Sequence, residues 1–112
     1  MRYYIYSENK PTEVSEPVYH EWELSDKYNY SFEDYSLTLN NKTFLIQIAY
    51  FGVFGDDEIA KPFVLSYSSY ATINSQLTEE SSIEFYETYE AVDFRRNELI
   101  RQIKKQLWPR YA

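Results

Sequence analysis

The chain has no cysteine, a single histidine and only two glycines among its 112 residues. Without cysteine it has no disulfide and no thiolate chemistry. With few glycines it offers few places where the backbone can turn tightly around a substrate. We find no phosphate-binding loop, no dinucleotide fingerprint and no zinc-ligand spacing. These absences disfavour an enzyme, and we expect no catalytic residue, no metal site and no cofactor.

Long hydrophobic runs are also missing. No stretch approaches the length of a membrane span, and the first residues, Met1-Arg2-Tyr3-Tyr4, contain no apolar signal region. We therefore expect a cytoplasmic protein with no membrane partner. The length fits one domain, and we expect a single domain over residues 1–112.

Basic residues are scarce except at the C-terminal end. Residues 1–94 carry 17 acids and 5 bases, whereas residues 95–112 carry 6 bases and 1 acid, which sum to the net charge of −7. An acidic body disfavours direct binding to nucleic acid and favours approach to a basic protein surface. A second interpretation stays open, in which the charge only keeps the protein in solution.

Alternating apolar and polar residues predict several strands. The clearest pattern is a hairpin in which Asn40-Asn41 forms the turn and Leu37 lies opposite Phe44. The polar stretch from Ser7 to Pro17 is predicted as a connection, and His20 as a structural residue beside Trp22. The predicted strands are Arg2–Tyr6, Val18–Leu24, Tyr35–Leu39, Thr43–Tyr50 and Phe63–Tyr70.

The last third of the sequence has the pattern of an amphipathic helix that ends at Pro109. Thr78, followed by two glutamates, predicts a start at that residue and a helix that reaches Trp108. Alternatively, Thr88 caps a shorter helix, and Ser81–Tyr86 is an edge strand. The predicted fold is α+β: a curved antiparallel sheet of four to five strands, with a long C-terminal helix packed on one face.

Acidic residues gather after the second glycine and near Thr78, and each group has an aromatic neighbour. We hypothesise that together they form a partner-binding face, because a field of one sign speeds encounter with an opposite field. The residues are Phe54, Asp56, Asp57, Glu58, Glu79, Glu80, Glu84, Tyr86 and Glu87. The basic end supplies a second candidate contact surface, formed by Arg101, Lys104 and Lys105.

These features predict a small acidic inhibitor that occupies the basic surface of a nucleic-acid-handling enzyme or complex. Phage-encoded antagonists of host defence and DNA-mimicking inhibitors have a similar composition, although no motif is shared. Two alternatives remain open: a toxin-neutralising immunity protein, and a subunit or adaptor of a larger assembly such as a phage structure. The sequence leaves the oligomeric state open.

Overall fold

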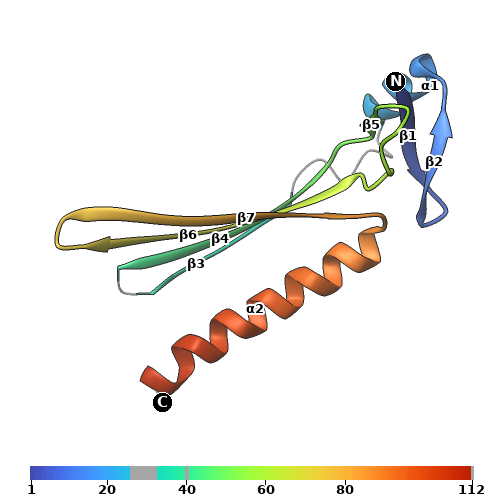
Figure 1. Ribbon diagram of the computed structural model, residues 1–112. Coiled ribbons are helices and arrows are strands. Elements are labelled where there is room, and N and C mark those ends of the chain that lie inside the picture. Colours follow the sequence, from blue (N-terminus) through green and yellow to red (C-terminus); the bar gives the residue numbers. More distant parts are fainter. Residues whose placement is uncertain (26–32, 40, 112) are drawn as a thin grey trace.

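The structure is a computed structural model that describes residues 1–25, 33–39 and 41–111. Figure 1 shows an elongated molecule in which a long sheet, a small sheet and a C-terminal helix meet at one end. In chain order the elements are β1 (Arg2–Ser7), β2 (Lys10–Val14), α1 (Glu16–Glu23), β3 (Glu33–Leu39), β4 (Lys42–Tyr50), β5 (Val53–Phe54), β6 (Phe63–Ile73), β7 (Gln76–Tyr86) and α2 (Tyr89–Tyr111).

The large sheet has the antiparallel order β3-β4-β6-β7, and α2 lies along one of its faces (Figure 1). We call this face the inner face. Side chains alternate along each strand, so every second residue of β4 and β6 points towards α2. The predicted α+β fold, an antiparallel sheet with a C-terminal helix on one face, is confirmed. Its core is formed by Phe44, Ile46, Ile48, Phe63 and Leu65 from the sheet, together with Val92, Leu99 and Ile103 from α2.

The predicted central hairpin is also confirmed, including its register. Leu37 pairs with Phe44 and Tyr35 with Ile46, as the alternation required. Residue Asn40 of the predicted turn lies outside the described residues. The predicted strand that begins at Phe63 is present as well, but it continues to Ile73 because it forms a second long hairpin with β7.

The small sheet was not predicted. It has the order β2-β1-β5 and lies with α1 at one end of the large sheet (Figure 1). The stretch after Ser7, predicted as a connection, contains β2, so that prediction was wrong. Glu8 and Asn9 have positive φ angles of 54° and 62°, which suit the tight turn of a β-hairpin. Pro11 is tolerated because β2 is an edge strand.

The stretch Val18–Leu24, predicted as a strand, belongs mostly to helix α1, so that prediction was wrong too. Pro17 lies in the first turn, where its missing N–H costs nothing. Tyr19 and Trp22 are three residues apart and form the buried side of the helix, with exposed fractions of 3% and 7%. The sequence from Val18 to Leu24 does alternate, but the two residues that reach the core, Tyr19 and Trp22, have the spacing of a helix.

The long helix predicted from Thr78 is wrong, and the alternative start at Thr88 is confirmed. The predicted end at Pro109 is wrong too, because α2 continues to Tyr111. Gln76–Tyr86 is an edge strand, and α2 begins at Tyr89. Asn74 and Ser75 form the turn between β6 and β7 with φ angles of 52° and 66°, again positive at both positions. A strand is favoured here because β7 pairs along its whole length with β6.

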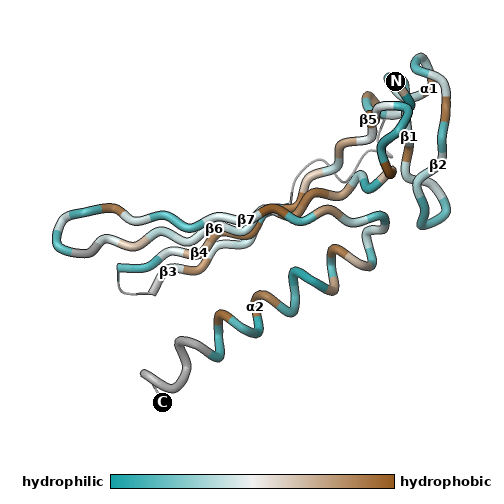
Figure 2. The backbone as a smooth tube through the Cα atoms, in the orientation of Figure 1, coloured by the Kyte–Doolittle hydropathy of each residue, from teal (hydrophilic) through white to brown (hydrophobic). Residues whose placement is uncertain are grey.

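The second face of the large sheet, which we call the outer face, has no covering layer among the described elements. Figure 1 shows that no described helix or strand crosses it. Figure 2 shows hydrophobic segments in the part of the sheet where β6 and β7 run beside β4. Ile83 and Phe85 on β7 are 61% and 57% exposed. The apolar residues that β7 places on this face are therefore exposed, whereas Leu45, Ala49 and Val64 on β4 and β6 are half-buried.

Candidate functional site

The most developed concave feature lies where β7 ends and α2 begins. The chain reverses at Glu87 and Thr88, and the Thr88 hydroxyl accepts a hydrogen bond from the Ala91 N–H at 3.2 Å. This is an N-cap contact, which satisfies one of the free amides of the first helical turn. The Tyr89 N–H donates to the Tyr6 hydroxyl at 2.9 Å, which fixes the helix start against β1.

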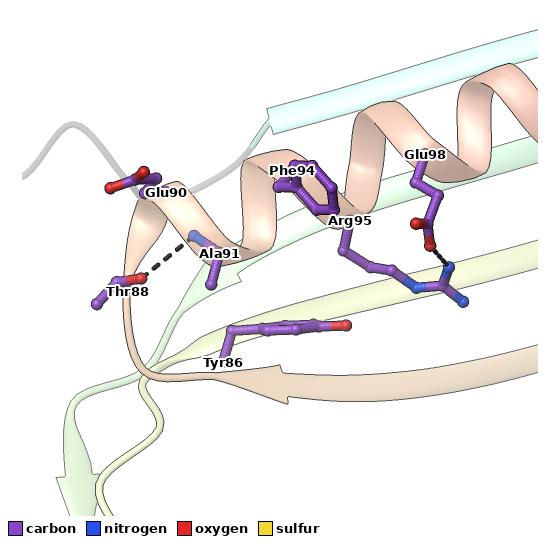
Figure 3. Close-up of a pocket in the computed structure, with 7 residues that line it drawn as sticks. All are labelled: Tyr86, Thr88, Glu90, Ala91, Phe94, Arg95 and Glu98. Atoms are coloured by element: carbon purple, nitrogen blue, oxygen red, sulfur yellow. Dashed lines mark hydrogen bonds and ion pairs between the residues drawn. The ribbon is translucent and has the colours of Figure 1, made fainter.

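Between this helix start and β7 lies an open groove of about 600 Å³ (Figure 3). One side is the inner face at the end of β7, and the other is the side of α2 nearest that edge of the sheet. The groove is lined by Tyr86, Thr88, Glu90, Ala91, Phe94, Arg95 and Glu98.

Arg95 organises the groove. Its guanidinium donates to the Glu84 carboxylate at 3.0 Å and also pairs with Glu98 (Figure 3 shows the latter contact). The Tyr86 hydroxyl donates to the same Glu84 carboxylate. Glu84 and Tyr86 of β7 are thus joined to Arg95 and Glu98 of α2 in one network of hydrogen bonds and ion pairs. This network fixes the position of α2 relative to β7.

The charges in this network shift one another's protonation. The hydrogen bond from Tyr86 and the guanidinium of Arg95 lower the pKa of Glu84, against the opposing effect of partial burial. Partial burial, followed by the charge of Glu84, raises the pKa of the Tyr86 phenol. The hydrogen bond to Glu84 raises the pKa of Arg95. At neutral pH Glu84 is therefore ionised and Tyr86 is neutral.

Phe94 is the apolar feature of the groove. It is 64% exposed, and it lies on the part of α2 turned away from the buried stripe of Val92 and Leu99. Leaving a phenyl ring in water forfeits about 2 kcal/mol relative to full burial. Contiguous exposed apolar surface marks interaction sites, and Phe94 lines the groove together with Tyr86 and Ala91.

The charge around Phe94 is mainly negative. From Glu84 to Glu98 the chain carries five carboxylates against two guanidiniums, and Arg96 pairs with Asp93 as Arg95 does with Glu84 and Glu98. Glu87 and Glu90 are exposed and form no ion pair with any described residue. The two free carboxylates are from Glu87 and Glu90; the paired ones are from Glu84, Asp93 and Glu98.

The structure does not unite the predicted partner-binding face. Glu84, Tyr86 and Glu87 lie at or beside the groove, on or next to the inner face. Glu79 and Glu80 lie near the far end of β7, about 13–17 Å from Glu84 at the ordinary rise of about 3.3 Å per strand residue. They alternate between the two faces, because β7 is a strand and not the predicted helix.

The predicted loop lies on the other side of the sheet. Asp56, Asp57 and Glu58 are exposed after β5, and Glu58 shares a shallow depression with Phe85 of the outer face. Arg2 fixes this loop by donating to the Gly55 carbonyl at 2.9 Å and to the Glu58 carbonyl. The loop acids and the groove therefore face different directions.

Phe54 does not have the position that we predicted for it. It is 8% exposed and packs edge-on against Tyr4 with ring centroids 5.7 Å apart. Its role is to join β5 to β1, so the loop does not present it as an anchor. The exposed aromatic at the acidic surface is Phe94. The sequence contained a signal for it, since Phe94 lies off the apolar stripe of the helix pattern.

The secondary basic surface is separate from the groove. Arg101, Lys104 and Lys105 are exposed on α2, and none of them pairs with a described carboxylate. Lys104 is about 14 Å along the helix axis from Arg95 at 1.5 Å per residue. Opposite charges thus lie towards opposite ends of α2.

His20 lies apart from this site on α1. Its side chain is 57% exposed and contacts Glu16 at 3.5 Å and Glu23 at 3.1 Å. Over the described residues no group of three or more histidine or carboxylate side chains could hold a metal ion. Neither helix is apolar enough over its described length to cross a membrane.

Comparison with known proteins adds no relative. The chain matches no protein-family model, no curated protein and no solved structure.

Proposed function

We propose that the protein is a small acidic inhibitor that binds a basic surface of another protein through the groove between β7 and α2. The observation that carries the proposal is the 64% exposed Phe94, set in a groove beside the free carboxylates of Glu87 and Glu90. An apolar anchor beside charges of one sign is the arrangement that a mixed apolar and basic surface would recognise.

The two kinds of group have different tasks. The carboxylates attract a basic partner over a distance of about a Debye length, roughly 10 Å at ordinary ionic strength. They also reject acidic proteins. Phe94 supplies contact area that excludes water once the partner has arrived, which is the usual character of an energetic hot spot.

The network under the groove supports binding by being formed in advance. Arg95, Glu84 and Tyr86 hold one another before any partner arrives. A fixed surface loses less conformational entropy on association than a mobile one. The loop acids Asp56, Asp57 and Glu58 face another direction, so in this proposal they add only to the long-range field.

A basic surface with apolar gaps is typical of proteins that handle nucleic acids, because they neutralise phosphates with lysine and arginine. We propose a partner of this class in the cytoplasm, whose nucleic-acid site the protein would occlude. No direct binding of nucleic acid by the chain itself is expected. A toxin with a basic active site would be recognised by the same physics.

A second function, as an adaptor in a larger assembly, is favoured by one feature. Arg101, Lys104 and Lys105 form no ion pair with a described residue, and they lie far from the acidic groove on the same helix. A helix with two oppositely charged ends can bind a different neighbour at each end.

The test uses the protein as bait in extract from its native host, followed by affinity measurement with the identified partner. We expect Phe94→Ala to weaken binding by about 30-fold or more, as loss of a hot spot of about 2 kcal/mol would do. Leu24→Ala is the matched control, because Leu24 is 90% exposed but follows α1 and does not line the groove. Equal affinity of both variants would refute the groove as the binding site.

A charge variant separates the inhibitor from the adaptor. Glu87→Lys/Glu90→Lys should slow association by about tenfold at low salt, and the difference should shrink as salt rises. The inhibitor proposal further requires that the wild-type protein displaces nucleic acid from its partner. If instead the triple variant Arg101→Glu/Lys104→Glu/Lys105→Glu abolishes binding and Glu87→Lys/Glu90→Lys does not, the result favours the adaptor function over the inhibitor function.

A further inference from the structure

The strand β7 presents a long free edge. It has 11 residues, and its neighbour among the described strands is β6 on one side only. The unpaired N–H and C=O groups of such an edge are a template for another strand. Free edges of this length are usually blocked in monomeric proteins.

The other edge strands are blocked in ordinary ways. β2 contains Lys10 and Pro11, and β5 has only two residues. β3 is shorter than β7 and has the exposed Asp34 near its start. β7 contains no proline, glycine or lysine, and its sequence is QLTEESSIEFY. Of the described edges, it is the one best suited to pairing.

The turn between β6 and β7 determines which groups point to the free edge. Because the turn has two residues, its flanking residues Ile73 and Gln76 form a hydrogen-bonded pair. Gln76 and every second residue after it therefore direct their N–H and C=O groups to β6. The odd-numbered residues from Leu77 to Phe85 direct theirs to the free edge, and their side chains lie on the outer face.

We propose that this edge binds β7 of a second copy of the chain, antiparallel and centred on Ser81. The two large sheets would then join across a two-fold axis into one continuous sheet. This register places Leu77 of one copy opposite Phe85 of the other, and Glu79 opposite Ile83. The exposed fractions of Leu77 and Phe85 in the single chain are 70% and 57%, so their contact would remove apolar surface from water.

The charges of β7 select this register over its neighbours. The backbone groups form hydrogen bonds only if each odd-numbered residue lies opposite an odd-numbered residue. The two-fold axis therefore shifts in steps of one residue, and its nearest alternative positions are residue 80 and residue 82. An axis at residue 80 places Glu80 opposite itself, and an axis at residue 82 places Glu80 opposite Glu84. Like charges directly opposite are destabilising. With the axis at Ser81, no two carboxylates of β7 are directly opposite.

The nearest like charges in this arrangement are diagonal pairs: the two Glu80 side chains with each other, and each Glu80 with Glu84 of the other copy. Diagonal neighbours are about 7–8 Å apart, where carboxylates that remain in water repel weakly. On the inner face Glu80 lies opposite Ser82, Thr78 opposite Glu84, and Gln76 opposite Tyr86. Charged and uncharged residues of β7 are therefore complementary to the same strand rotated by two-fold symmetry.

The first measurement is the mass of the full chain in solution by sedimentation equilibrium. We expect twice the chain mass of 13.5 kDa. Ser81→Lys and Ser81→Glu should each weaken self-association by about fivefold or more, because each puts like charges at the axis. An equimolar mixture of the two variants should associate at least as tightly as the wild type. Recovery in the mixture occurs only if residue 81 faces residue 81.

A proline pair provides the matched control. Ser81→Pro removes an N–H from the free edge and should weaken self-association by about tenfold or more. Ser36→Pro does the same on the opposite edge of the sheet, at an exposed serine of β3, and should leave the mass unchanged. Unchanged circular dichroism would show that both variants fold.

Three results would overturn the proposal. One is a wild-type chain that stays monomeric from roughly 1 µM to 1 mM, a range that covers weak self-association. Another is a dimer that Ser81→Pro leaves intact while Ser36→Pro breaks it. The third is a mixture of charge variants that fails to recover. A monomeric chain would leave the edge for a strand of a different protein.

Discussion

At the scale of single residues, Gly52 shows how closely the two sheets approach each other. A Cβ atom at Gly52 would lie 2.2 Å from the Tyr4 carbonyl oxygen and 2.9 Å from the rings of Tyr19 and Tyr50. The contact with Tyr4 is with backbone, which cannot move aside, and the same carbonyl accepts the Tyr50 hydroxyl at 2.7 Å. Only a residue without a side chain fits here.

We therefore expect Gly52→Ala to destabilise the protein by about 1–3 kcal/mol, the usual cost of overpacking a core. Gly55→Ala is the control, because its Cβ would meet only the flexible side chain of Glu58, at 3.0 Å. Urea unfolding of both variants measures the difference. Equal stabilities would show that the approach at Gly52 is looser than described.

The aromatic residues mark a limit of prediction from sequence at this scale. The alternation around Phe44 and Ile46 identified both as core residues, and both are almost fully buried. Phe54 was predicted to be exposed because it lies between two glycines in a polar stretch. Its burial depends on β1, which is about 50 residues away in the chain and pairs with it. Local pattern contains no information about such a partner.

At the scale of elements, most of the large sheet and the segment of α2 from Tyr89 followed from periodicity. The error at Thr78 arose because capping residues and acids also suit an exposed strand. The residues of β7 are mostly exposed, so the alternation that normally reveals a strand was weak. The pairing with β6, a tertiary contact, decided the outcome. Part of the acidic site was divided for the same reason, since its residues from Glu79 to Glu87 were assigned to one helix.

The contact between β7 and α2 predicts a pH dependence. Glu84 has a lowered pKa in the folded protein because of Tyr86 and Arg95. Its contribution to stability is therefore present above the ordinary carboxyl pKa, and is lost as the pH falls through the lowered value. Glu84→Gln should cost less than about 1 kcal/mol at neutral pH, because the side chain is partly exposed.

The measurement is the difference in unfolding free energy between the wild type and Glu84→Gln, followed from pH 7 into the acid range. The difference should shrink as the pH falls. Glu90→Gln is the control, because Glu90 lies near the start of the same helix but forms no ion pair with a described residue. A constant difference for Glu84→Gln would contradict the network.

At the scale of the whole molecule, a cluster of aromatic rings joins the small sheet to the large one. Tyr6 of β1 packs edge-on against Phe63 of β6 with ring centroids 4.8 Å apart. Tyr50 of β4 lies 5.1 Å from Phe63 and 5.2 Å from Trp22 of α1. The two sheets therefore share one core, and neither buries its apolar residues without the other.

From this shared core we predict that the chain unfolds as one domain. In a variant with Trp108→Phe, the fluorescence of Trp22 reports the small sheet, while far-ultraviolet circular dichroism reports mainly the large sheet and α2. The thermal midpoints of the two signals should agree within about 2 °C, as in a two-state transition. Tyr6→Leu should lower both midpoints together, because Tyr6 contacts Phe63 and accepts the Tyr89 N–H. Loss of the Trp22 signal ahead of the circular dichroism would show that the small sheet is a separate folding unit.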